Sequence, residues 1–205
     1  MGMTKTSGEK RIYWVIKRVL DIFFSAVLLV FLALPLFLIW IAVRLDSPGS
    51  GIFRQIRVGR DGKLFTCYKF RTMYGSAPPC CPSSQFHDAD RYITPVGRFL
   101  RRTSLDELPQ LLNVLKGDMS LVGPRPLILA ETEVHKGRRQ SGVYGLRPGL
   151  TGLSQVRGRD SVSDARKVEL DTEYLWNFGF IQDAKIIGMT VYTVITGDGM
   201  SKKRL

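Results

Sequence analysis

The N-terminal part of the chain is dominated by a long run of apolar residues. Residues 22–43 contain no charged side chain, which makes 22 uncharged positions in a row. A helix rises about 1.5 Å per residue, so the run has roughly the 30 Å length of a bilayer core. Pro35 lies within the run and removes a backbone hydrogen bond, which kinks or breaks a helix. The pattern therefore predicts a membrane helix that turns at Leu34 and Pro35.

Positive charges lie on both sides of this run. They are Lys5, Lys10, Arg11, Lys17 and Arg18 before it, and Arg44, Arg54, Arg57, Arg60 and Lys63 after it. Because basic flanks stay on the cytoplasmic side, both ends are drawn to the same face of the membrane. The residues alone leave two alternatives, a re-entrant helix and a spanning one. Irregular backbone at that depth needs internal partners, and Ser25 is the one hydroxyl in the run that could supply a hydrogen bond.

Alternating apolar and polar residues follow the membrane segment. They flank the sequence GRDGK, which has the composition of a tight turn, so a β-hairpin is predicted. Its apolar positions are Phe53, Ile56, Val58, Leu64 and Phe65. Lys69 and Arg71 extend the second strand, and the alternation predicts that half of the hairpin faces solvent.

Helical periodicity dominates the rest of the chain. Helices are predicted over residues 96–101, 107–116, 128–139, 163–177 and 183–196. The last carries a broad apolar band, which either packs on the core or lies in the membrane interface. A Gly/Pro-rich loop is predicted over 117–126, and a turn with irregular or extended backbone over 147–159.

The expected fold is α/β in a loose sense. Residues 1–46 would form the basic N-terminus and the membrane helix, and residues 47–205 a mostly helical cytoplasmic domain with a small β-hairpin and interfacial helices. A doubly wound sheet is not expected, because no series of apolar strands alternates with helices.

Composition restricts the partners. The 205 residues carry a net charge of +12, which predicts an anionic partner: nucleic acid, a lipid surface or phosphorylated substrates. No nucleic-acid-binding motif accompanies the charge, so nucleic acid is disfavoured. The three cysteines include the adjacent Cys80 and Cys81, which with His87 match no zinc-site spacing. Their odd number argues against a disulfide framework and for a reducing compartment.

Two adjacent carboxylates, Asp106 and Glu107, mark the candidate site. If Asp106 is an N-cap, Pro109 falls in the first helical turn, where proline is tolerated, so a helix is predicted to begin at Glu107. The helix dipole would keep Asp106 ionised and favour a phosphate beside it. Such a carboxylate can be a metal ligand, a base or a nucleophile that forms an acyl phosphate. The alternative is a capping aspartate followed by a solvated glutamate.

Several basic residues could complete a diphosphate site opposite the carboxylates. Arg125 lies on the rigid turn GPRP, and Arg147, Arg157 and Arg159 lie among glycines that would let backbone approach a ligand. Lys69 and Arg71 precede the carboxylates on a strand and are further candidates for substrate contact.

The chain resembles the bacterial sugar transferases, the monotopic polyprenyl-phosphate phosphoglycosyl transferases, in their small minimal catalytic form. The motifs that carry the resemblance are KRVLDI, IFRQIRVG, YKFRTM, SLDELPQLLNVLKGDMSLVGPRP and RPGLTGLSQVRGR, which cover nearly the whole chain. The resemblance implies transfer of a sugar 1-phosphate from a UDP-sugar to polyprenyl (undecaprenyl) phosphate. The reaction would initiate glycoconjugate biosynthesis at the cytoplasmic face of the bacterial inner membrane, in contact with membrane lipids.

The resemblance also implies roles for individual residues. Asp106 would be the nucleophile that forms a phosphosugar-aspartyl intermediate and releases UMP, Glu107 would help to bind Mg²⁺, and Pro35 would break a re-entrant anchor. Two departures stand out: Leu34 replaces a serine common before the proline, and RGRD at 157–160 replaces the Asn-Gly-Arg-Asn of members specialised for diacetamido sugars. The sugar, the polyprenol length and the choice between monomer and homodimer stay open. The competing function is a noncatalytic basic protein that binds membrane surfaces and uses Asp106 only as a cap.

Overall fold

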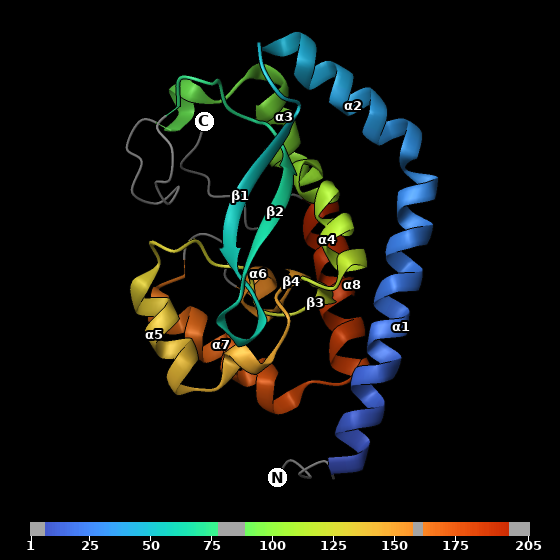
Figure 1. Ribbon diagram of the computed structural model, residues 1–205, viewed down its shortest axis with the longest axis vertical. Helices are drawn as coiled ribbons and strands as arrows, with labels where there is room; N and C mark the ends of the chain where they lie inside the picture. The colour runs from blue at the N-terminus through green and yellow to red at the C-terminus, as the bar shows by residue number, and fades with distance from the viewer. Residues whose placement is uncertain (1–6, 78–88, 158–161, 197–205) are drawn as a thin grey trace.

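A computed structural model describes residues 7–77, 89–157 and 162–196 (Figure 1). The N-terminal half contains α1 (Ser7–Phe31), α2 (Ala33–Asp46), β1 (Ile52–Val58), the 3-10 turn η1 (Arg60–Gly62), β2 (Leu64–Phe70), η2 (Ala89–Tyr92), α3 (Pro95–Thr103), η3 (Leu105–Gln110) and α4 (Leu111–Lys116). The C-terminal half contains β3 (Ser120–Val122), α5 (Thr132–Gln140), η4 (Val143–Gly145), β4 (Gly149–Thr151), α6 (Leu153–Arg157), α7 (Asp164–Asn177) and α8 (Phe180–Thr196). The described part is mostly helical, as predicted.

The N-terminal helix is broken, and the two halves are bent by 65°. The break lies at Leu32 rather than at Leu34 and Pro35, because Pro35 has no N–H to donate to the carbonyl of Phe31, four residues earlier. The helix resumes at once, since the amide of Leu36 donates to the carbonyl of Leu32 at 2.8 Å. Within the described residues no single helix has the length and apolar character to cross a bilayer, whereas the segments Arg11–Phe31 and Ala33–Asp46 together do.

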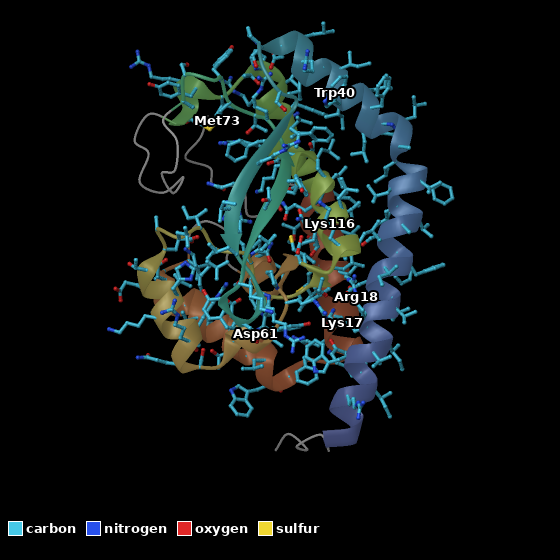
Figure 2. The ribbon with its side chains drawn as sticks, viewed as in Figure 1. Lys17, Arg18, Trp40, Asp61, Met73 and Lys116 are labelled. Carbon is cyan, nitrogen blue, oxygen red and sulfur yellow. The ribbon has the colours of Figure 1, made fainter. Side chains whose placement is uncertain are left out.

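Helix α1 turns its polar residues inward and its apolar residues outward. Tyr13, Lys17, Asp21 and Ser25, spaced four apart, form a buried stripe against the domain. Lys17, labelled on α1 in Figure 2, donates to the Asp183 carboxylate of α8 at 2.7 Å. The exposed residues of α1 include Ile12, Val15, Ile16, Val19, Phe23, Phe24, Val30 and Phe31. The Ser25 hydroxyl is buried without a partner among the described residues, so it does not satisfy the helix break as the sequence suggested.

The predicted hairpin is confirmed, and its register decides which residues reach the site. Strands β1 and β2 are antiparallel, with Gln55 opposite Cys67 and Arg57 opposite Phe65. Because directly opposed residues share a face, Arg57, Cys67 and Lys69 all lie on one face of the hairpin. Several apolar positions of the hairpin, namely Phe53, Ile56 and Leu64, are exposed, while Val58 is buried.

The C-terminal half packs around one apolar cluster. Its buried members are Tyr13, Val122, Leu146, Leu153, Leu170, Tyr174, Phe178 and Ile186. Helix α8 therefore packs on the core through Ile186, but it also leaves Ile187, Val191 and Ile195 exposed. The prediction of helices over 163–177 and 183–196 is confirmed, and residues 96–101 lie within α3. Residues 128–139 are helical only from Thr132 onward.

The glycines after the GPRP loop allow two backbone segments to pack closely. A Cβ on Gly149 would lie 2.1 Å from the amide nitrogen of Gly123, and a Cβ on Gly152 would lie 2.0 Å from the carbonyl oxygen of Gly123. These glycines let two backbone segments meet, where strands β3 and β4 pair in parallel. The prediction that glycines here let backbone approach a ligand stays a prediction. The predicted extended backbone is confirmed over β4, whereas residues 153–157 form helix α6 instead of irregular backbone.

The end of α2 is tied to the start of α3. The Asp46 carboxylate accepts a hydrogen bond from the amide of Val96 at 3.1 Å, in the manner of a helix cap. We expect Asp46→Ala to lower the free energy of unfolding by about 1 kcal/mol, the usual cost of losing such a cap. A thermal melt in detergent measures the effect. Asp164→Ala, which removes only an exposed i,i+3 pair with Lys167, should change the melting temperature less.

Candidate active site

The carboxylate pair lies on a tight turn rather than at the start of an α-helix. Helix α3 ends at Thr103, and Ser104 adopts the left-handed conformation with φ of 57°. The following residues form the 3-10 helix η3, and α4 begins only at Leu111. The predicted helix start at Glu107, with Asp106 as its cap, was therefore wrong. The left-handed Ser104 starts the turn before Asp106, and the missing N–H of Pro109 favours the tighter 3-10 geometry over an α-helix.

Asp106 is a half-buried carboxylate without a bonding partner. Within the described residues it accepts no hydrogen bond and forms no ion pair. Burial raises its pKa to about 6, against the lowering effect of Lys69, Arg101 and Arg125, and the charge of Glu107 raises it further. Because no α-helix begins at Glu107, the expected effect of a helix dipole on Asp106 does not apply, and desolvation dominates the shift. Above that pKa, Asp106 carries an ionised oxygen that is available for reaction.

Glu107 has the opposite electrostatic environment. Its Oε1 atom lies 2.6 Å from Lys69 Nζ and 3.6 Å from Arg125 Nη1. Burial would raise its pKa, but Lys69 and Arg125 overcome that effect and lower the pKa to about 2. Two adjacent carboxylates with pKa values displaced in opposite directions can take different chemical roles.

A shallow recess, open to solvent, lies beside Glu107. It is lined by Arg57, Cys67, Lys69, Glu107, Gln110, Arg125, Pro126, Gly149, Leu150 and Gln155. The structure thus brings together Glu107, Lys69 and Arg125 from the predicted set. Arg57, Gln110 and Gln155 were missed, as was Arg101, whose charge acts on Asp106. Arg57 and Lys69 each lie an even number of positions from Asp61 at the hairpin turn, so both side chains are expected on the same face of the hairpin. This spacing was a sequence signal that could have identified Arg57.

Two of the predicted basic residues are engaged elsewhere. Arg71 donates to the carbonyls of Val43 at 3.0 Å and Ser47 at 2.6 Å, and so holds the C-terminal end of α2. Arg147 donates to the carbonyl of Gly117 at 3.0 Å, and it lines a separate recess against α1 with Arg18 and Trp14 among its neighbours. Neither side chain lines the recess beside Glu107.

The last predicted arginines do not complete the recess either. Arg157 pairs with Glu173 of α7 at 2.7 Å, with both side chains partly exposed. Arg159 lies outside the described residues, as do Cys80, Cys81 and His87, so the predictions about them stay predictions.

A buried ion pair holds the loop that carries Arg125. Arg138 donates through Nε and Nη2 to Asp171 at 2.9 and 2.6 Å, and Ser154 donates to the same carboxylate at 2.9 Å. Arg138 also donates to the backbone carbonyl of Arg125 at 2.8 Å. The pair therefore connects α5, α7 and α6 to the GPRP loop, and it fixes the backbone from which the Arg125 side chain reaches Glu107.

The acidic donors at the site are few. Among the described residues no group of three or more His, Cys, Asp or Glu side chains could enclose a metal ion. Magnesium is commonly held by one or two carboxylates, with substrate phosphates and water completing the octahedron. Asp106 and the Oε2 atom of Glu107, neither of which has a partner in the described part of the chain, fit that mode of binding together with a phosphate ligand.

Comparison with known proteins gives consistent matches. A family model described as bacterial sugar transferase matches residues 12–197. The uncharacterized sugar transferase EpsL of Bacillus subtilis is 39% identical over 188 residues, which cover 92% of this chain and 91% of EpsL. The UDP-glucose:undecaprenyl-phosphate glucose-1-phosphate transferase of Caulobacter vibrioides is 41% identical over 191 residues, or 89% of this chain and 70% of that protein. The undecaprenyl-phosphate galactose phosphotransferase of Salmonella typhimurium is 40% identical over 198 residues, or 90% of this chain but 41% of that longer protein.

Proposed function

This chain belongs to the bacterial sugar transferase family, and from that premise we propose that it transfers a sugar 1-phosphate from a UDP-sugar to undecaprenyl phosphate. Two similar proteins are named for the transfer of glucose 1-phosphate and for galactose phosphotransfer to this lipid phosphate. The observation that carries the proposal is the pairing of Asp106, unpartnered among the described residues and with a raised pKa, with Glu107, which Lys69 and Arg125 hold in its ionised form.

The reaction would proceed in two displacements at phosphorus. An ionised oxygen of Asp106 attacks the phosphorus that bears the sugar, the bond to the bridging oxygen breaks, and UMP leaves with that electron pair. The resulting phosphosugar-aspartyl group is attacked by an oxygen of the lipid phosphate, and the Asp106 carboxylate leaves. Lys69 and Arg125 lie where positive charge can offset the charge of the diphosphate.

We also propose that the enzyme requires Mg²⁺. A bound Mg²⁺ would supply neutralisation of the diphosphate and stabilisation of the departing UMP. Oxygen atoms of Asp106 and Glu107 Oε2 would hold it together with donor phosphate oxygens. Removal of divalent ions with EDTA should abolish turnover, and added Mg²⁺ should restore it.

A single-turnover assay tests the proposed function. Purified protein in detergent is mixed with Mg²⁺ and each of a panel of UDP-sugars, without lipid acceptor, and UMP release and protein mass are followed. One UDP-sugar should give UMP in proportion to enzyme and add the mass of a phosphosugar to the protein. Absence of UMP with every UDP-sugar, while undecaprenyl phosphate is also supplied, would refute the proposal.

The pH dependence of kcat/KM should show a decrease at low pH that follows the protonation of Asp106. Asp106 must be ionised to attack, and burial raises its pKa to about 6, so kcat/KM should fall about tenfold per pH unit below that value. Lys69 lowers the pKa of Asp106, so Lys69→Met should move the midpoint to higher pH in addition to slowing the reaction. Rates measured between pH 5 and 8 give both midpoints. A midpoint that moved to lower pH in the variant would contradict the assignment.

We propose that α1 and α2 form a re-entrant anchor, with the domain on the cytoplasmic side. The support comes from the outward apolar face of α1, the 65° bend and the basic flanks at both ends. Single cysteines at positions 11 and 50, in a chain otherwise without cysteine, test this arrangement in cells. A membrane-impermeant maleimide should label neither position in intact cells and both after permeabilisation. Labelling of one position in intact cells would indicate a spanning helix.

The apolar face should also determine membrane association. Val30 and Phe31 are 76% and 79% exposed at the bend, where we expect the greatest depth. A charge near the centre of a bilayer costs roughly 2.5–3.5 kcal/mol, so the double variant Val30→Asp, Phe31→Asp should shift most of the protein out of the floating fraction in vesicle flotation. Gln140→Asp, an exposed change on α5, should float like the wild type.

A further inference from the structure

We propose that Arg57 and Gln155 contact the UDP-sugar donor, Arg57 through a phosphate oxygen and Gln155 through a sugar hydroxyl, which makes Gln155 a determinant of sugar selectivity. This inference rests on the proposed function and specifies how the same site would bind its donor. Arg57 lies on β1 and Gln155 on α6, and both line the recess beside Glu107.

Arg57 has no anionic partner of its own. Its two terminal nitrogens donate to neutral groups, the carbonyl of Pro126 at 2.9 Å and the amide oxygen of Gln55 at 2.6 Å, and its Nε is buried without a partner among the described residues. Arg138, by contrast, is buried against the carboxylate of Asp171. A buried guanidinium without a carboxylate is costly unless an anion approaches it.

The charges around the recess also favour binding of an anion next to Arg57. Arg57, Lys69 and Arg125 line it together with a single carboxylate, Glu107. Burial lowers the pKa of Arg57, and the charge of Arg125 lowers it further, which reflects the same excess of positive charge. A phosphate is the anion that arginines bind best, because the guanidinium nitrogens match its oxygens.

Gln155 requires a hydrogen-bond donor on the ligand, which an ionised phosphate does not provide. Its Nε2 donates to the carbonyl of Leu150 at 3.0 Å, which orients the amide, and its Oε1 is buried without a partner among the described residues. An acceptor oxygen needs a ligand that donates, and an ionised phosphate cannot donate. A sugar phosphate meets both requirements, since its phosphate accepts from Arg57 and a ring hydroxyl donates to Gln155.

Deoxy analogues of the donor test the role of Gln155. The ratio of kcat/KM for the preferred UDP-sugar and for each of its monodeoxy analogues is measured in the wild type, Gln155→Leu and Gln155→Glu. In the wild type, kcat/KM for one analogue should be roughly 10-fold or more below kcat/KM for the parent UDP-sugar, because the buried Oε1 of Gln155 is left unpaired. In Gln155→Leu, kcat/KM should be similar for this analogue and for the parent UDP-sugar. In Gln155→Glu, which keeps an acceptor oxygen, the difference in kcat/KM should remain.

Binding measurements test the role of Arg57. Equilibrium dialysis of the same UDP-sugar should show affinity reduced roughly 10-fold or more in Arg57→Met and partly restored in Arg57→Lys, which keeps the charge. The reduction should be the same for every sugar, since the phosphate is common to all of them. Arg54→Met, an exposed change three residues away along β1 and on the opposite face, is the matched control and should bind like the wild type.

The outcomes separate this inference from the proposed function. If the wild type releases UMP and yet Gln155→Leu discriminates against the same analogue as strongly as the wild type, an ordered water or a purely structural contact explains Gln155 and the inference is overturned. It is also overturned if Arg57→Met binds the donor as well as Arg54→Met does. If the wild type itself releases no UMP from any UDP-sugar, the proposed function fails and this inference fails with it.

Discussion

Replacing Asp106 with asparagine is expected to reduce turnover by at least about 1,000-fold, the scale seen when a covalent nucleophile is lost. Asparagine has nearly the same shape, but its amide oxygen carries no charge and cannot form the acyl phosphate. The single-turnover assay measures the effect directly, because neither UMP nor a mass increase should appear. The substitution separates the enzyme from the noncatalytic alternative, since a membrane-binding protein without catalysis would tolerate an asparagine of the same shape at this position.

The same variant should not lose stability. Burial raises the pKa of Asp106, so the ionised form is disfavoured in the folded state, and a neutral side chain should melt at an equal or higher temperature at pH 7.5. Asp61→Asn is the matched control: Asp61 lies at the exposed hairpin turn with φ of 56°, a conformation that asparagine adopts readily. It should leave both rate and melting temperature unchanged. Wild-type turnover in Asp106→Asn would refute the assignment of the nucleophile.

Asp171→Ala is expected to destabilise the protein by about 3–5 kcal/mol, because it leaves the buried Arg138 guanidinium without its carboxylate. The variant also removes the acceptor of the Ser154 hydroxyl. Thermal and urea melts in detergent measure the loss. Glu173→Ala, which breaks the partly exposed pair with Arg157, should cost no more than about 1 kcal/mol. Equal losses in the two variants would show that burial does not govern the strength of these pairs.

Asp171→Asn offers a milder test of the positioning role. It keeps one oxygen, which can accept from Ser154 or from Arg138 but not from both, and it removes the charge that holds Arg138. Arg138 in turn holds the carbonyl of Arg125. We expect KM for the donor to rise in protein that remains folded. An unchanged KM in a folded variant would mean that the loop keeps its place without the ion pair.

Local patterns predicted much of the fold. The break caused by Pro35, the hairpin around its GRDGK turn and the helix over 163–177 all follow from short-range rules of backbone geometry and periodicity. The exact helix break was missed by a few residues because a proline disrupts the carbonyl four positions earlier, and the helix over 107–116 was missed in part because a left-handed Ser104 changes the turn that follows.

The sequence identified the two carboxylates of the site but not all of the basic and polar residues around them. The Asp106 and Glu107 pair was singled out, and Lys69 and Arg125 were among the predicted substrate contacts. Arg71 and Arg147, however, bind backbone carbonyls instead of lining the recess. Which carbonyl an arginine reaches depends on how distant segments pack, and no sequence spacing encodes it. The position of Gln155 beside Arg57 likewise follows only from the way in which β1 and α6 pack around one recess.

The contact between Lys17 and Asp183 also limits when α1 can dock on the domain during synthesis of the protein. The two residues are separated by 166 positions, so at ribosomal rates of roughly 5–20 residues per second the carboxylate is made about 8–30 s after the ammonium group. During that interval Lys17 lacks the carboxylate that it bonds in the folded protein. The contact that joins α1 to α8 therefore forms only after most of the described residues have been synthesised.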